Sequence, residues 1–315
     1  MTTSAPATAR SSAPSTFGRG LAFGVGAYGL WGILPLYFLL LAPAGAIEIV
    51  AWRVLFSLFF CAILLTATRG WQRFAAILRD RRIALTLGAA GGLILINWVI
   101  FIFAALAGQV VEASLGYFTT PIVTVLLGVF VLRERLRVMQ WVAIGISAAA
   151  VVVIAVNYGT FPSIALGLAL SFGLYGLVKK RVGGQVDAIS GLAIETMWIA
   201  PVAAIMLLVV GVTSGLTLGT ISPLHTTAII GSGIITAVPL LLFASAARRL
   251  PLVYLGLTQY LAPILQFLLG VFILGEDMPP ARWAGFALVW VALVLLTIDM
   301  VSSNRASRRL AVAHA

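Results

Sequence analysis

Residues 115–141, LGYFTTPIVTVLLGVFVLRERLRVMQW, recur without a gap as residues 257–283, LTQYLAPILQFLLGVFILGEDMPPARW. Pro121 aligns with Pro263, and Glu134 aligns with Glu276, at a constant offset of 142 positions. The first copy runs into the basic segment 133–137, whereas the second runs into the acidic segment 275–279. In a membrane protein, a repeat whose flanking charge changes sign indicates two halves of opposite orientation.

The composition indicates a membrane protein. Apolar residues make up 62% of the 315 residues, charged residues make up 9%, and the mean hydropathy is +1.12. A soluble domain with so few charges would lack the polar surface that it needs. A helix needs about 20 residues to cross the hydrocarbon core. We therefore predict an all-α integral membrane protein with ten transmembrane helices, near residues 20–41, 47–68, 83–105, 109–132, 138–156, 162–178, 187–210, 227–247, 250–274 and 282–299.

Ten helices and one duplication predict five helices per repeat. An odd number of crossings inverts the second repeat relative to the first. We predict repeats at residues 20–156 and 162–299, a disordered tail at residues 1–19 and a second tail at residues 300–315. Chance similarity between two Leu- and Gly-rich helices is the alternative, but it does not explain the charge inversion. Gly88 and Gly92, four residues apart, predict a close contact between helices.

The net charge of +11 raises the possibility of a nucleic-acid partner, but the distribution of the charge argues against one. Ten crossings place 18 of the 20 Lys and Arg residues in the tails or in loops on one side, and the two exceptions are Arg53 and Arg282. This is the positive-inside rule, and it predicts that both tails are cytoplasmic. Nucleic-acid binding would need basic clusters interleaved with aromatic residues, and these are absent from the sequence. The single Cys61 excludes an intramolecular disulfide.

Polar residues inside the spans are the candidate binding residues, because each one carries a desolvation cost in lipid. Spans four and nine present equivalent faces with helical spacing, made of Tyr117, Pro121, Thr124 and Gly128 in one and Gln259, Pro263, Gln266 and Gly270 in the other. Each proline frees a backbone carbonyl that needs another partner. We predict that the two faces line a cavity near the membrane midplane. The alternative is a pair of kinked structural helices whose polar side chains bind neighbouring helices.

Arg53 and Glu195 lie well inside predicted spans, again 142 positions apart and with opposite charge. A charge at that depth needs a partner or water. The functional interpretation is that Arg53 attracts an anion and that Glu195 binds the coupling proton. The alternative is that Arg53 extends outward to Glu48 or Glu112 and that Glu195 accepts a hydrogen bond from the protein.

Four further residues complete the predicted substrate site, and Pro239 is a third proline predicted to kink a helix that lines the pathway. Asn97 is a polar residue in span three, and Thr236 lies close to Pro239 in span eight. Trp31 and Tyr175 belong to the equivalent motifs YGLWG and FGLYG, and we predict that they stack on the substrate. The alternative for these two aromatic residues is packing within the bundle.

Several stretches resemble one known family. They are residues 112–118 (EASLGYF) with Pro121, residues 236–244 (TAVPLLLFA), residues 255–263 (LGLTQYLAP), residues 28–32, and Glu195-Thr196 with Pro201. Together they are similar to RarD-type permeases of the EamA branch of the drug/metabolite transporter superfamily. The resemblance implies ten spans, two EamA repeats and an exporter of the bacterial inner membrane, often labelled a chloramphenicol-sensitivity or resistance permease. The chain departs from the family pattern at Thr119-Thr120, where the family has Ile-Asn, and at Leu106, where it has Asn.

We therefore expect a secondary transporter that exports a small amphipathic drug or metabolite by alternating access, coupled to protons because no GxxxxGK[ST] sequence is present. The alternatives are a flippase for lipid-linked molecules and a non-transporting sensor or assembly subunit. An enzyme is not expected, because the only histidines are His225 and His314 and the only cysteine is Cys61. The expected partners are the lipid bilayer, a small-molecule substrate and protons, without a metal, a cofactor or nucleic acid.

Overall fold

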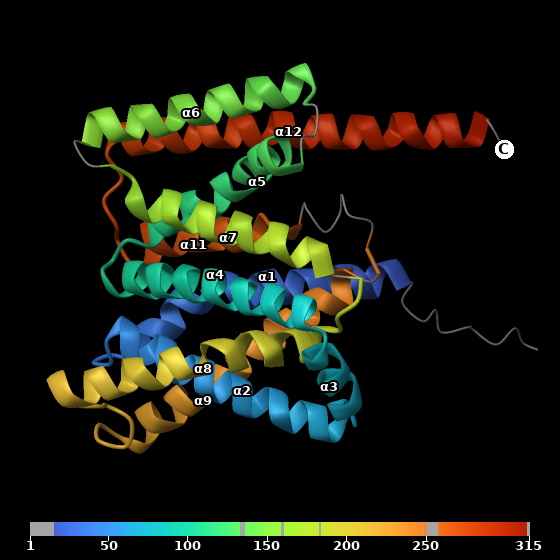
Figure 1. Ribbon diagram of the computed structural model, residues 1–315. Helices are drawn as coiled ribbons and strands as arrows, with labels where there is room; N and C mark the ends of the chain where they lie inside the picture. The colour runs from blue at the N-terminus through green and yellow to red at the C-terminus, as the bar shows by residue number, and fades with distance from the viewer. Residues whose placement is uncertain are drawn as a thin grey trace, which may run out of the picture.

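The structure, a computed structural model, describes residues 16–132, 136–158, 161–182, 184–247, 249–250 and 258–313 (Figure 1). Within these ranges the chain is helical and contains no strand. The helices are α1 (Thr16–Leu40), α2 (Ala46–Ala67), α3 (Trp71–Arg79), α4 (Arg81–Leu106), α5 (Val110–Leu132), α6 (Val138–Tyr158), α7 (Ser163–Val182), α8 (Ala188–Thr213), α9 (Pro223–Ala247), α11 (Leu261–Leu268), the π-helix η1 (Leu269–Ile273) and α12 (Pro280–Ala313).

Seven of the described helices are long and apolar enough to cross a bilayer. They cover residues 17–40, 46–67, 81–106, 110–131, 188–213, 223–243 and 280–299. Three predicted spans coincide with shorter apolar helices, at residues 138–153, 163–179 and 261–273. The predicted span 250–274 also includes residues 251–257, which lie outside the described residues, as do residues 1–15 of the predicted N-terminal tail. The chain is thus a multi-pass helical membrane protein, and ten crossings stay a prediction.

The basic segment between the predicted spans 47–68 and 83–105 contains a short helix, α3. Trp71, Phe74, Ile77 and Leu78 recur at helical spacing, and Ile77 packs inward while the arginines remain exposed. Asp80 ends α3 and caps α4, because its carboxylate accepts hydrogen bonds from the backbone N–H groups of Arg82 (3.0 Å) and Ile83 (3.1 Å). The nine-residue helix is amphipathic rather than apolar, which is why a search for long apolar segments misses it.

The helix packing repeats between the two halves of the chain. α1 packs against α9 and α11, and its counterpart α7 packs against α4 and α5. The equivalent helices α2 and α8 pack against each other, as do α6 and α12. In Figure 1, α6 and α12 lie side by side and run in opposite directions. This exchange of partners is the packing expected of two repeats related by a pseudo-two-fold axis.

Two equivalent glycines allow a close approach between helices of different halves. A Cβ atom at Gly91 of α4 would lie 2.7 Å from the carbonyl oxygen of Glu195 in α8. A Cβ atom at Gly233 of α9, 142 positions later, would meet the carbonyl oxygen of Phe56 in α2 in the same way. The prediction for Gly92 was wrong, because a Cβ atom there has no neighbour within 4 Å. Gly91, not Gly92, faces the partner helix.

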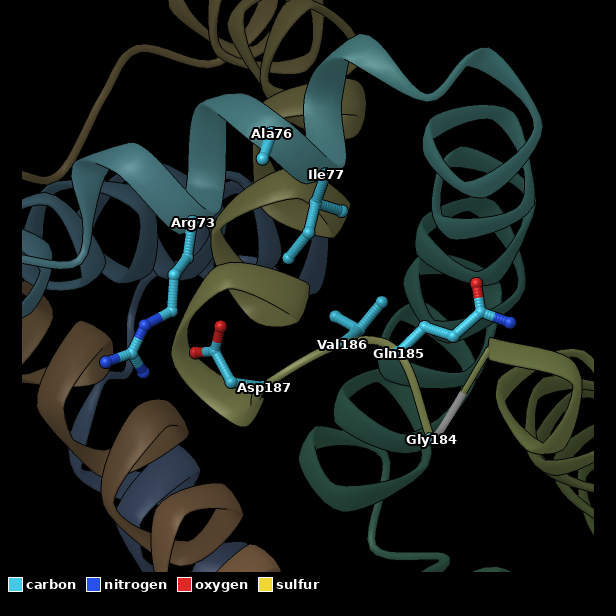
Figure 2. Close-up of a pocket in the computed structure, with 7 residues that line it drawn as sticks. All are labelled: Arg73, Ala76, Ile77, Gly184, Gln185, Val186 and Asp187. Atoms are coloured by element: carbon cyan, nitrogen blue, oxygen red, sulfur yellow. The ribbon is translucent and has the colours of Figure 1, made fainter.

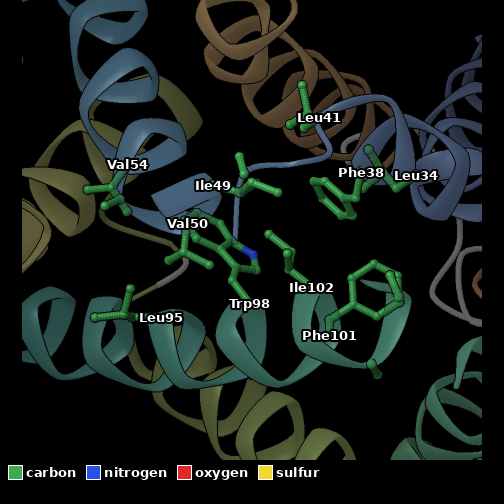
Figure 3. Close-up of a cluster of buried hydrophobic side chains, with 14 of the residues drawn as sticks. Leu34, Phe38, Leu41, Ile49, Val50, Val54, Leu95, Trp98, Phe101 and Ile102 are labelled. Atoms are coloured by element: carbon green, nitrogen blue, oxygen red, sulfur yellow. The ribbon is translucent and has the colours of Figure 1, made fainter. Parts of the chain in front are cut away.

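The largest buried apolar cluster lies between α1, α2 and α4 (Figure 3). Phe38 from α1, Val50 from α2 and Trp98 and Ile102 from α4 meet there. The cluster also includes Leu168 of α7, Ile199 of α8 and Ile229 of α9, so it joins the two halves, and it forms the apolar surroundings of Arg53.

Candidate functional site

Arg53 is held inside the bundle rather than at its edge. Its side chain is 4% exposed, and its Nε donates a 2.6 Å hydrogen bond to the Thr236 hydroxyl of α9. The guanidinium carbon lies 4.2 Å from the ring centroid of Trp98 and 5.5 Å from that of Phe38. The structure does not show the predicted outward path to Glu48, because that carboxylate instead accepts a 2.7 Å hydrogen bond from the Thr217 backbone. Arg53 therefore contacts Thr236 and aromatic rings.

Asn97 joins three helices through hydrogen bonds. Its side-chain oxygen accepts a 3.0 Å hydrogen bond from the Tyr117 hydroxyl of α5. Its amide nitrogen donates to the Ser171 hydroxyl (3.1 Å) and the Leu168 carbonyl (3.3 Å) of α7. The predicted polar role of Asn97 thus has specific partners, and two of them, Tyr117 and Ser171, carry side chains that reach the same buried region.

Glu195 of α8 is paired with a cation that the sequence analysis did not select. Its side chain is 1% exposed, and its carboxylate lies 2.5 Å from the Lys179 ammonium of α7. The Tyr175 hydroxyl donates a 3.2 Å hydrogen bond to the same carboxylate. Gly191 leaves the space that Lys179 occupies, because a Cβ atom at Gly191 would lie 3.4 Å from Nζ. Glu195 thus accepts a hydrogen bond from the protein, as the alternative expected, and also forms an ion pair.

Lys179 was counted among the basic loop residues because span six was predicted to end at residue 178. Helix α7 continues to Val182, so Lys179 still lies on the helix, one turn after Tyr175. Residues four apart on a helix share a face. This spacing is the sequence signal that identifies Lys179 as a neighbour of Tyr175, whereas its contact with Glu195 depends on how α7 packs against α8.

Aromatic contacts connect these groups into one buried row, here called the polar–aromatic column. Neighbouring ring centroids along it are 5.5 to 6.0 Å apart. At one end of the row of rings the Arg53 guanidinium contacts Phe38, and at the other end the Tyr175 hydroxyl donates to Glu195. In order, the column consists of Arg53, Phe38, Phe101, Tyr117, Phe172, Tyr175, Glu195 and Lys179. It crosses α2, α1, α4, α5, α7 and α8, so it passes through both repeats.

The remaining predicted residues lie apart from the contacts that define the column. Gln266 of α11 is 2% exposed, and its amide donates a 3.1 Å hydrogen bond to the Trp31 backbone carbonyl. The Trp31 ring packs against Tyr28 and Phe243, which is the packing role considered as the alternative. Thr124 is exposed, and its hydroxyl binds the Thr120 carbonyl of its own helix. Their substrate-binding roles stay predictions.

The prolines and Gln259 are placed as follows. Pro239 and Pro263 are buried, whereas Pro121 and Gln259 are half-buried. Tyr117 and Thr124 therefore differ in environment although they were predicted to share one face. The proline in α5 lies between them, and only the part of the face before the proline contacts the column.

Glu276 closes the end of the bundle opposite α3. Its two carboxylate oxygens accept hydrogen bonds from the backbone N–H groups of Val110 (2.6 Å) and Val111 (2.9 Å) at the start of α5. These donors belong to the start of α5 in the first repeat, not to the start of the following helix, α12. Burial raises the pKa of the Glu276 carboxyl, and the two N–H donors oppose that shift. Glu134, its equivalent, lies outside the described residues.

The comparisons with known proteins follow the same division into halves. The model of the EamA-like transporter family matches the chain twice, at residues 18–156 and 162–298. The chain belongs to the EamA-like transporter family. It is 46% identical to the protein RarD of Streptomyces exfoliatus over 92% of this chain and 91% of that protein. It is 40% identical to the protein RarD of Escherichia coli, covering 91% of this chain and 96% of that protein.

Two further matches extend the comparison. The chain is 30% identical to the chloramphenicol-sensitive protein RarD of Pseudomonas aeruginosa, covering 93% of this chain and 98% of that protein. It also resembles a protein of known crystal structure with a TM-score of 0.56 at 20% identity, covering 92% of this chain and 98% of that one. The structural likeness shows a shared fold and nothing finer. The predicted resemblance to RarD-type permeases is confirmed.

A pocket in this EamA-like transporter lies away from the predicted binding residues. It has a volume of about 510 Å³ and is lined by Arg73, Ala76 and Ile77 of α3 and by residues 184–187 (Figure 2). None of the residues predicted to bind substrate lines it. In the part of the chain that the structure describes, no group of three His, Cys, Asp or Glu side chains is placed to hold a metal ion.

Proposed function

We propose that this chain is a proton-coupled secondary transporter that exports a small amphipathic molecule across the bacterial inner membrane, with both tails in the cytoplasm. The observation that carries the proposal is the polar–aromatic column, which crosses helices of both repeats. Transporter sites form at repeat interfaces near the bilayer midplane. Buried polar side chains inside a membrane span carry a desolvation cost, so their presence there points to a function. In this proposal the two halves rock against each other and expose the column to one side of the membrane at a time.

Glu195 is the proposed proton-binding residue, and Lys179 is its partner in the unprotonated state. Protonation of Glu195 removes the negative charge that holds the Lys179 ammonium inside the bundle. The ammonium is then left without a counter-charge in a region of low dielectric, which favours its movement toward water. Because the two residues belong to α7 and α8, this exchange loosens the contact between those helices. Proton binding is thereby linked to a rearrangement of the second half.

The test uses purified protein in proteoliposomes with an imposed pH gradient. Chloramphenicol is the first probe, because a relative is named for sensitivity to it, and a bacterial metabolite mixture followed by mass spectrometry is the second. We expect wild-type protein to accumulate a compound against its gradient when protons flow the other way. Glu195→Gln is expected to abolish accumulation while retaining exchange of labelled for unlabelled compound. Glu112→Gln, which changes a carboxyl outside the column, serves as the matched control.

Three results would count against the proposal. Accumulation by Glu195→Gln at the wild-type level rules out the coupling role of Glu195. The absence of any proton-driven flux from both probes rules out proton coupling as a whole. Transport of a fluorescent lipid, without transport of any soluble compound, would favour the flippase alternative.

A further inference from the structure

The equivalent buried residues Arg53 and Glu195 have their charges balanced differently. Glu195 has its counter-charge within the chain, in the form of Lys179. Arg53, at the equivalent position of the first repeat, forms no ion pair with any of the described residues. Its Nη1 is buried and has no hydrogen-bond partner among those residues. The second repeat thus neutralises its buried charge, whereas the first repeat leaves one positive charge without an anion.

The groups around Arg53 do not replace that anion. Thr236 is neutral, and its hydroxyl is already engaged, since it accepts from Nε and donates to the Ser232 carbonyl at 2.8 Å. The Trp98 and Phe38 rings attract the cation through their π faces, but they carry no net charge. An uncompensated buried charge is strongly unfavourable, so the site is expected to gain from a bound anion.

We propose that the transported molecule supplies this anion and is a monocarboxylate with an apolar or aromatic body. The proposal deepens the proposed function and rests on it. The carboxylate binds the free edge of the Arg53 guanidinium, whose planar donors match a carboxylate, and the apolar body packs against Trp98 and Phe38. A single guanidinium balances a single negative charge. A phosphate dianion would need a second cation, and among the described residues no other Lys or Arg side chain contacts these rings.

The inference predicts a preference that depends on charge rather than on shape. Phenylacetate, phenylacetamide and phenethylamine have the same ring and nearly the same length, but at pH 7 they are an anion, a neutral molecule and a cation. Binding of each compound to purified full-length protein in detergent is measured by titration calorimetry. We expect phenylacetate to bind at least tenfold more tightly than the amide or the amine.

Variants assign that preference to Arg53. Arg53→Met is expected to lower the affinity for phenylacetate at least tenfold and to leave the affinity for phenylacetamide unchanged. Arg53→Lys keeps the charge and loses the planar donors. Its affinity for phenylacetate is expected to lie between those of the wild-type protein and of Arg53→Met. Arg79→Met is the matched control, because it removes an exposed arginine from α3 and should leave all three affinities unchanged.

Equal binding of phenylacetate and phenylacetamide to the wild-type protein overturns the proposal. An Arg53→Met variant that still prefers phenylacetate to phenylacetamide also overturns it. So does an absence of binding by both phenylacetate and octanoate, a monocarboxylate with an aliphatic body. If neither Arg53 variant folds, the affinities of the wild-type protein for the three compounds still test whether the site prefers an anion. Phenylacetate that binds at Arg53 but is not carried into proteoliposomes refutes the transport function and leaves the anion site standing. Transport of the amide and the amine without the acid refutes the anion class and leaves the transport function standing.

Discussion

Replacement of Gly91 by alanine tests the contact that positions Glu195. The added Cβ would lie 2.7 Å from the Glu195 carbonyl oxygen and 3.3 Å from its carbonyl carbon. Both atoms belong to the backbone, so neither can rotate away, and α4 must move from α8. Overpacking of this kind costs about 1–3 kcal/mol. Alanine recovers about 1 kcal/mol through its higher helix propensity. We therefore expect Gly91→Ala to destabilise the protein by up to about 2 kcal/mol.

The neighbouring residue provides the control. A Cβ atom at Gly92 has no neighbour within 4 Å, so Gly92→Ala adds the same carbon to the same helix without a contact. We expect this variant to be neutral or stabilised by up to about 1 kcal/mol. Both variants gain the same helix propensity, so their unfolding free energies should differ by the overpacking cost alone, about 1–3 kcal/mol.

The assay is reversible unfolding of purified protein in mixed micelles by titration with a denaturing detergent, followed by far-ultraviolet circular dichroism. Gly233→Ala, at the equivalent position, is measured beside the other two variants and should resemble Gly91→Ala. If Gly91→Ala and Gly92→Ala are equally stable, the close approach of α4 to α8 is wrong. If Gly233→Ala behaves like Gly92→Ala instead, the two interfaces are not equivalent and the structural symmetry of the repeats fails.

Three further predictions follow from single contacts. Lys179→Met leaves Glu195 without its counter-charge and should destabilise the protein by about 1–3 kcal/mol, less than for a fully buried pair because the Lys179 side chain is 32% exposed. Adding Glu195→Gln should restore most of that loss in the same unfolding assay, and a double variant no more stable than Lys179→Met alone would contradict the pairing. Glu276→Gln weakens the hydrogen bonds to the start of α5 and should cost about 1–2 kcal/mol in unfolding free energy, whereas an effect no larger than that of Glu112→Gln would show that the bonds contribute little. In a Cys61→Ser background, a membrane-impermeant maleimide applied to intact cells should label Asp277→Cys and not Arg137→Cys, and labelling of both would refute the inverted orientation.

Much of the helical framework is predictable from the sequence because a helix in lipid must satisfy its own backbone hydrogen bonds. That requirement is local, so long apolar segments mark α2, α4 and α5 to within a few residues. The short amphipathic helix α3 escapes the same criterion, because its stability depends on packing one face against α4 and α8.

The candidate site was only partly predictable. Arg53, Asn97 and Glu195 stand out because polar residues are costly in a span, whatever their neighbours. Lys179 does not stand out, because it resembles any basic residue at a helix end. Thr236 and Tyr117 were selected, but their pairing with Arg53 and Asn97 depends on how the helices pack. Thr124 was selected by the same reasoning as Tyr117, and Trp31 by the same motif as Tyr175, yet the contacts of Thr124 and Trp31 lie elsewhere.

The sequence by itself determined the membrane environment, the duplication and the change in flanking charge, because these are properties of composition and order along the chain. Only the tertiary structure decided that Gly91 rather than Gly92 meets the partner helix, that Glu276 binds the start of α5, and that Lys179 reaches Glu195 while Arg53 has no anion. Those outcomes depend on the rotation of each helix about its axis and on the separation between helices. Both are set by side-chain packing between residues far apart in sequence, which no local pattern records.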